Sequence, residues 1–127
     1  MTTSTARARY DAHAAKLARM PIADLLAMAT ITDKRVDELR AEAARTGDYT
    51  AAQALNMARS SIATAIEDRH PQIIPLLEQW ADDDTDARTY TQALTYAVLA
   101  CGIITQRRLD AAVTAMTAAA HQIGLLP

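Results

Sequence analysis

An acidic run is the first stretch of this 127-residue chain whose residue types and spacing could bind an ion. The segment 82–93 reads DDDTDARTYTQA and places carboxylates at its positions 1, 3 and 5, as the start of an EF-hand calcium loop does. That loop also needs a glycine at position 6 and a bidentate acid at position 12, where this chain has Ala87 and Ala93. We therefore expect no calcium site, and we assign these acidic residues to ending one helix and capping the next.

Other residues that could bind a metal or act in catalysis also lack the partners that such a site requires. Glu67 and His70 have the i, i+3 spacing of dinuclear carboxylate bundles, but neither His13 nor His121 repeats it with a carboxylate. Cys101 has apolar neighbours, which predict a buried, inert thiol instead of a nucleophile. A glycine-rich phosphate loop and a nucleophile elbow are both missing from the sequence. We expect the protein to be no enzyme and to use no metal or organic cofactor.

The segment 51–71, AAQALNMARSSIATAIEDRHP, has residues that could contact DNA. With Asn56 at a turn and Ile62 and Ile66 holding a second helix, it resembles the helix-turn-helix of small repressors over about twenty residues. Under this interpretation the DNA-binding residues are Arg7, Arg9, Arg59, Ser60, Thr64 and Arg69.

The same segment also fits one uninterrupted helix. A break would put Ala58 at the N-cap, where alanine costs roughly 1 kcal/mol relative to serine or asparagine. Apolar residues continue at spacings of three and four from Leu55 through Ile62 to Ile66. The acidic pair 67–68 would also repel phosphate. We favour the single helix and keep the helix-turn-helix as the alternative.

A second segment, 25–40, offers a better turn at Thr30 and a good N-cap at Thr32. Its would-be recognition helix carries Asp33 and Asp37, however, and acidic side chains are wrong for a groove lined with phosphates. We therefore expect no DNA contact from this segment.

Charge and cysteine content narrow the function classes further. Thirteen basic and fifteen acidic side chains give a net charge of −2, so no overall basic field attracts nucleic acid or an anionic membrane. The single cysteine excludes an internal disulfide. The N-terminus lacks the apolar region of a secretory signal, and the most apolar run, 96–104, is far below the roughly 20 residues of a membrane span. The sequence predicts a soluble, cytoplasmic protein with no membrane partner.

The helices that must position these residues follow from the apolar spacing. Three glycines, four prolines, no phenylalanine and no period-two alternation predict an all-α fold: one domain, 1–127, forming a compact bundle of five to seven helices with short connections. Thr32 is expected to cap the first helix of a hairpin and Gly47 to end it. The predicted helices are 4–20, a short one at 21–29, the hairpin at about 32–69, 72–80, a long helix capped by Asp84 or Thr85, and a last helix from Thr105 after a break near Gly102.

These features favour a small helical interaction protein, such as an adaptor, inhibitor or regulatory subunit, that binds a protein partner or self-associates. Segments 20–28 and 106–126 are rich in alanine and methionine, which predicts adaptable apolar surface that could seal a homodimer or a partner groove. The alternative is a small dimeric helix-turn-helix DNA-binding regulator that uses about 49–70. Aromatic and clustered charged residues dominate interfaces, so the candidate contact residues are Tyr10, Trp80, Asp82, Asp83, Asp84, Asp86, Tyr90 and Tyr96.

Overall fold

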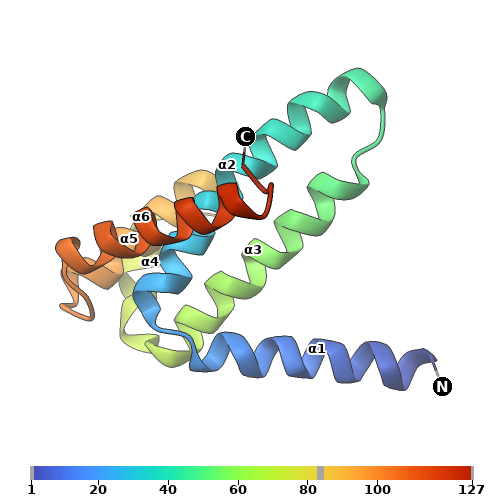
Figure 1. Cartoon of the computed structure of the whole chain (residues 1–127). Helices are drawn as coiled ribbons and strands as arrows, with labels where there is room; N and C mark the ends of the chain where they lie inside the picture. Colours follow the sequence, from blue (N-terminus) through green and yellow to red (C-terminus); the bar gives the residue numbers. More distant parts are fainter. Residues whose placement is uncertain (1, 83–84, 127) are drawn as a thin grey trace.

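The computed structural model describes residues 2–82 and 85–126, and it shows an all-α bundle, as the sequence predicts (Figure 1). Over those residues there is no strand. The elements are α1 (Thr2–Arg19), α2 (Ile22–Thr46), α3 (Thr50–Arg69), the 3-10 turn η1 (Pro71–Ile73), α4 (Ile74–Trp80), α5 (Ala87–Ala100) and α6 (Gln106–Gln122).

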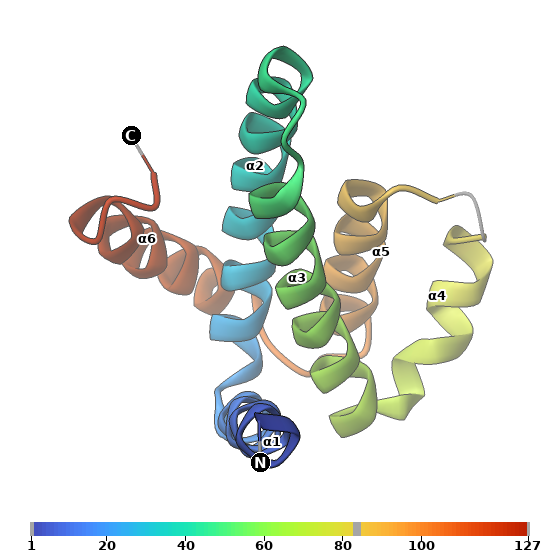
Figure 2. The ribbon, with the colours of Figure 1, turned by 90° about the vertical axis from the view of Figure 1, so that its right-hand side faces the viewer.

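Helix α2 is the centre of the bundle and packs against α3, α5 and α6 (Figure 2). Leu25 and Leu26 near its start have no exposed surface, because the other helices surround this part of α2. Ile66 of α3 and Leu94 and Val98 of α5 complete the same fully buried cluster. The apolar spacing predicted two separate helices, at 21–29 and from Thr32. Both segments belong to the single helix α2.

The prediction of a break between a short helix at 21–29 and a second helix from Thr32 is wrong. Helix α2 runs through this point, and the hydroxyls of Thr30 and Thr32 donate to the carbonyls of Leu26 and Met28, at 3.0 and 2.6 Å. A threonine whose hydroxyl bonds four residues back sits inside a helix and needs no capping role. The turn of the second helix-turn-helix interpretation is consequently absent, and segment 20–28 lies mostly in the core instead of forming a free surface.

Helix α3 confirms the interpretation of 51–70 as one uninterrupted helix. Its backbone stays helical through Asn56, and the hydroxyls of Ser60 and Ser61 donate to the carbonyls of Asn56 and Met57, each at 3.2 Å. With α2 it forms the predicted hairpin, whose first helix begins ten residues earlier than 32. Gly47 closes the hairpin at φ 79°, and its N–H donates to the carbonyl of Ala43 at 2.7 Å.

The last two helices, α5 and α6, begin at carboxylate or hydroxyl caps. Thr105 caps α6 as predicted, with its hydroxyl accepting from the N–H of Arg108. Helix α5 is capped by Asp86, which accepts from the N–H of Thr89 at 2.8 Å, and not by Thr85. Thr85 instead donates to the carboxylate of Asp82 at 3.0 Å, and Asp84 lies outside the described residues.

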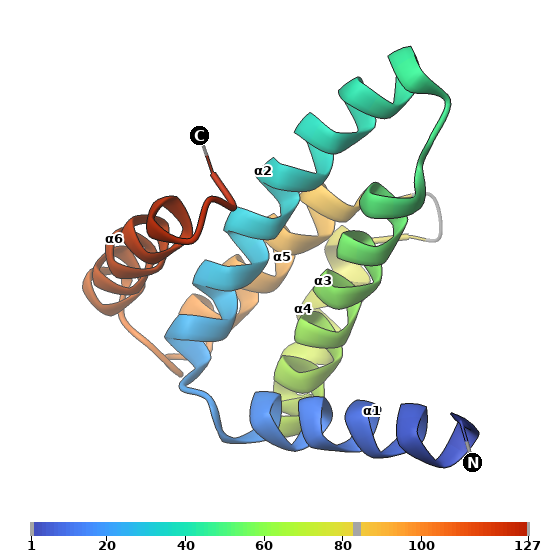
Figure 3. The same ribbon diagram turned by 45° about the vertical axis from the view of Figure 1, so that its right-hand side comes forward.

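Helix α1 extends away from the bundle (Figure 3). Only Leu17 in its last turns is buried, whereas every described side chain from Thr5 to Lys16 is exposed. The chain exposes 8270 Å², but the scaling for folded monomers gives about 6,600 Å² at 13.7 kDa. Roughly 1,700 Å² is therefore exposed beyond what a chain of this mass normally leaves in water.

We expect Thr105→Ala to lower the free energy of unfolding by about 0.5–2 kcal/mol, because the first turn of α6 loses its cap. Thr105→Ser keeps the accepting oxygen and should retain most of that stability. Thr114→Ala is the matched control, since Thr114 is exposed within the same helix and only donates to the carbonyl of Asp110. Urea denaturation measures all three, and equal losses for alanine at positions 105 and 114 would exclude the capping role.

Candidate functional site

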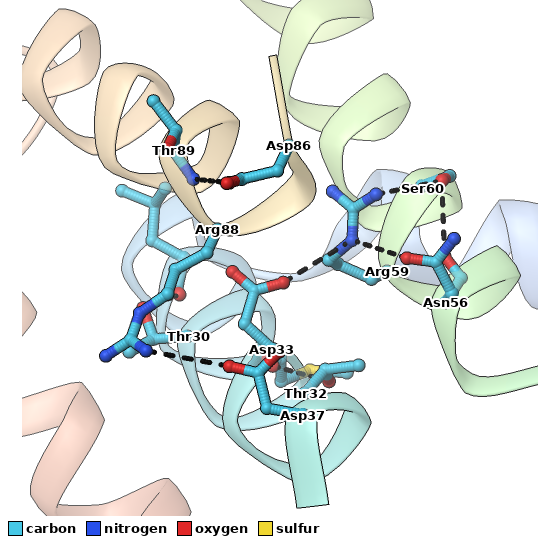
Figure 4. A network of polar contacts seen from close by, with 12 residues as sticks. Thr30, Thr32, Asp33, Asp37, Asn56, Arg59, Ser60, Asp86, Arg88 and Thr89 are labelled. Atoms are coloured by element: carbon cyan, nitrogen blue, oxygen red, sulfur yellow. Dashed lines mark hydrogen bonds and ion pairs between the residues drawn. The ribbon is translucent and has the colours of Figure 1, made fainter. Parts of the chain in front are cut away.

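A buried ion pair joins α2 to α3. The Asp33 carboxylate of α2 and the Arg59 guanidinium of α3 approach to 3.4 Å between Oδ1 and Nε (Figure 4). Both residues are at least nine-tenths buried, with exposed fractions of 7% and 8%. Charges this deep are tolerated only when they are paired, so the two helices are fixed relative to each other at this point.

Arg59 is held by its own helix as well. Its Nε donates to the Asn56 side-chain oxygen and its terminal nitrogen donates to the Ser60 hydroxyl, each at 3.3 Å (Figure 4). The residue faces α2 because it shares the inner face of α3 with Ile62 and Ile66. The structure therefore corrects the expectation that Arg59 projects outward to contact DNA.

Helix α5 contributes to the same site through Thr91 and Arg88. Burial raises the pKa of the Asp33 carboxyl above its ordinary value of 3.8, while the Thr91 hydroxyl and the Arg59 guanidinium act in the opposite direction. Arg88 lies 3.6 Å from the Asp37 carboxylate, one turn further along α2, in an exposed pair. Together Asp33, Asp37, Arg59, Arg88 and Thr91 form a group that we name the polar junction.

One oxygen in the polar junction is incompletely satisfied. The Asp33 Oδ1 atom is buried and receives no hydrogen bond, although Arg59 lies within ion-pair distance. The Nε–H of Arg59 is directed at Asn56, so the contact with Asp33 is mainly electrostatic. An incompletely solvated carboxylate favours its neutral form, which agrees with the raised pKa of Asp33.

A cleft of about 1050 Å³ opens beside the polar junction, between α2, α5 and α6. Its polar wall includes Asp33 and Thr91. Its apolar wall includes Ile31, Leu99 and Val113, one from each of the three helices. The cleft is thus amphipathic and is built on helices that the polar junction and the core hold in place.

An exposed aromatic pair adjoins the cleft. The rings of Trp80 and Tyr96 lie 5.3 Å apart between centroids and are tilted by 52°, as is favourable for aromatic pairs. Their exposed fractions remain high, at 60% and 53%. Tyr96 also lines the cleft, whereas Trp80 is the last residue of α4. We name these two residues the aromatic surface.

The other predicted contact residues have different surroundings. Tyr90 is half-buried and packs against the core. Asp82 and Asp86 are exposed, and the Thr89 amide bonded to Asp86 lowers the pKa of that carboxyl. The side chain of Tyr10 and the residues Asp83 and Asp84 lie outside the described part of the structure.

The remaining residues of the DNA-binding alternative lie on two helices. Arg7 and Arg9 are exposed on α1. Ser60, Thr64 and Arg69 line a smaller cavity of about 290 Å³ between α3 and α1. Arg69 also donates a hydrogen bond to the carbonyl of Met20, so part of this face of α3 is covered by the chain itself.

Two features bear on chemistry at other positions. In the segments 2–82 and 85–126, no three histidine, cysteine, aspartate or glutamate side chains form a group that could hold a metal ion. Cys101 is exposed, which corrects the prediction of a buried thiol, because α5 ends at Ala100 and the chain turns outward there.

None of the described helices is long and apolar enough to cross a bilayer.

The sequence carried a signal for the polar junction that apolar spacing alone missed. Asp33 lies between Ala29 and Val36 on the buried stripe of α2, and Arg59 occupies the equivalent stripe of α3 between Ala52 and Ile66. A single charge of opposite sign in each of two facing stripes indicates a buried pair.

The sequence matches no protein-family model, no curated protein and no solved structure.

Arg59→Met should lower the free energy of unfolding by about 3–5 kcal/mol, because it leaves the buried Asp33 carboxylate without its opposite charge. The double variant Asp33→Leu/Arg59→Met should recover most of the loss, since apolar residues of similar volume often replace a buried pair at little cost. Urea denaturation of the single and double variants tests this. A loss below about 1 kcal/mol for Arg59→Met would show that the pair does not hold α2 and α3 together.

The raised pKa of Asp33 predicts a pH dependence of stability. The folded protein binds the Asp33 proton more tightly than the unfolded chain does, so its contribution is fully present below 3.8 and is lost as the pH rises through the raised pKa. Relative to Asp33→Asn, the wild type should therefore gain stability as the pH falls through that window. Asp86→Asn is the opposite control, because the lowered pKa of Asp86 gives stability that is lost as the pH falls. Parallel pH profiles for the wild type and Asp33→Asn would exclude this account of Asp33.

Proposed function

We propose that the protein acts by binding a protein partner through the aromatic surface and the adjoining cleft, without catalysing a reaction. The observation that carries this proposal is the exposure of Trp80 and Tyr96 as a contacting pair at the edge of a large amphipathic cleft. Tryptophan and tyrosine are the residue types most enriched among those that dominate binding energy at protein interfaces.

The size of the cleft favours a macromolecular occupant. Small-molecule pockets span about 300–1,000 Å³, and the cleft of about 1050 Å³ lies at the upper limit of that range. An inserted helix or loop would cover the apolar wall and leave the polar wall near Asp33 to fix its orientation.

The polar junction serves this function through rigidity. Asp33 is buried against Arg59 and Thr91, so its carboxylate is engaged in holding helices instead of presenting a reactive group. Because α2, α3 and α5 are already fixed relative to one another, binding a partner costs less conformational entropy. A preformed surface is what an adaptor or inhibitor requires.

A photo-crosslinking amino acid at position 96 tests the proposal in the native host. We expect irradiation to yield a discrete crosslinked protein, and we expect Trp80→Ala to reduce its yield at least about tenfold, because that residue type commonly contributes 2 kcal/mol or more. Position 57 is the matched control, since Met57 is 71% exposed on α3 and lies outside the cleft lining.

Two results would contradict the proposal. One is the same set of crosslinked proteins from positions 57 and 96, which would indicate random collision. The other is an unchanged yield after Trp80→Ala in a variant that circular dichroism shows to be folded.

A further inference from the structure

Residues 5–16 of α1 form an exposed helical segment that we name the arm. Every described side chain in the arm is exposed, and α1 joins the bundle mainly through contacts with α3. Most helical stability in proteins comes from packing one face of the helix, and the exposed arm gains little of it on its own molecule, so we expect another surface to cover it.

The arm is strongly basic for a chain with a net charge of −2. The arm carries Arg7, Arg9 and Lys16 against Asp11 as its one acidic side chain, and Arg19 follows it in the last turn of α1. Arg7 lies 3.9 Å from Asp11 in an exposed pair, which contributes little, so most of the positive charge is available to a partner.

The opposite charge gathers beside the aromatic surface. Three described residues of the segment 70–87 are exposed acids, Glu78, Asp82 and Asp86, and the segment contains neither lysine nor arginine. Its described residues include η1 and α4, and they bring Trp80 together with the exposed side chain of Ile74. A basic helix fits this surface because arginine and lysine pair with carboxylates and also stack on indole and phenol rings.

The arm of one molecule does not reach this surface on the same molecule. Helix α1 leaves the bundle beside the end of α3 and points away, whereas α4 lies on the outer side of α5 (Figures 2 and 3). The complementary surfaces therefore can meet only between molecules.

We propose that the partner at the aromatic surface includes a second copy of this chain, with the arm of each copy lying across α4 and the exposed carboxylates Glu78, Asp82 and Asp86 of the other. Reciprocal exchange gives a closed two-fold dimer, because each copy offers one arm and one acceptor surface. The accessible surface beyond that expected for a folded monomer of this mass is about 1,700 Å². This is larger than the roughly 800 Å² that each partner buries in a standard interface. This inference rests on the proposed function, since it names one occupant of the same surface.

A charge-swap experiment on the purified full-length protein tests the dimer. The arm variant is Arg9→Glu/Lys16→Glu, and the acceptor variant is Glu78→Arg/Gln79→Arg; all four positions are exposed. Arg107→Glu/Arg108→Glu on α6 is the control matched to the arm variant, with the same change of charge at exposed positions away from both surfaces. Analytical ultracentrifugation at low salt measures each protein alone and in mixtures, after circular dichroism has verified folding.

We expect the wild type and the control to dimerise, and each swapped variant alone to dissociate with a constant raised at least about tenfold by like charges at both interfaces. Mixing the arm and acceptor variants should restore a dimer, because both interfaces of the mixed pair again join opposite charges. Salt near 1 M should weaken the wild-type dimer.

A wild type that remains monomeric at about 100 µM, where even a weak dimer would form, would overturn the inference. Failure of the mixed variants to associate would do the same. Either result would leave the proposed function intact if position 96 still crosslinks to a different protein in cells. Conversely, a dimer that survives while crosslinking at position 96 is insensitive to Trp80→Ala would contradict the proposed function of the aromatic surface.

Discussion

The buried pair between Asp33 and Arg59 is the interaction on which the arrangement of helices depends. Apolar packing between α2 and α3 tolerates small shifts along their axes, because alanine-rich surfaces offer several similar positions. A paired carboxylate and guanidinium do not tolerate such shifts, since losing the contact leaves a charge in a medium that solvates it poorly. Thr91 extends the same constraint to α5, so the orientation of the cleft is set by polar contacts and its stability by the surrounding apolar core.

The local elements were largely predictable from the sequence. Gly47 and Thr105 are signals that act within a few residues, and both work as expected because nothing distant competes with them. The continuity of α2 through Thr30 and Thr32 was not predictable in this way, because a threonine hydroxyl can cap a helix or bond back within one. Tertiary burial on both sides decided in favour of the longer helix.

The candidate site likewise has features that local sequence predicts and features that depend on tertiary packing. Trp80 and Tyr96 were predicted as contacts from residue type, since aromatic residues dominate interfaces, but their mutual contact depends on how α4 packs against α5. Arg59 was a DNA contact under the helix-turn-helix alternative, because spacing alone did not show which face of α3 is buried. The cleft could not be predicted at all, because it exists only where α5 and α6 both pack on α2 and diverge from each other.

The position of α6 against α2 has a consequence for how the chain is synthesised. Ala23 and Ala27 of α2 pack against Ala112 of α6, so two helices meet closely although more than eighty residues separate these alanines. During translation, the α2–α3 hairpin can form as soon as it leaves the ribosome, while the stripe of α2 that receives α6 stays in water until the last helix is complete. We therefore expect an early, local stage of folding at the α2–α3 hairpin and a later stage in which α6 covers this stripe of α2.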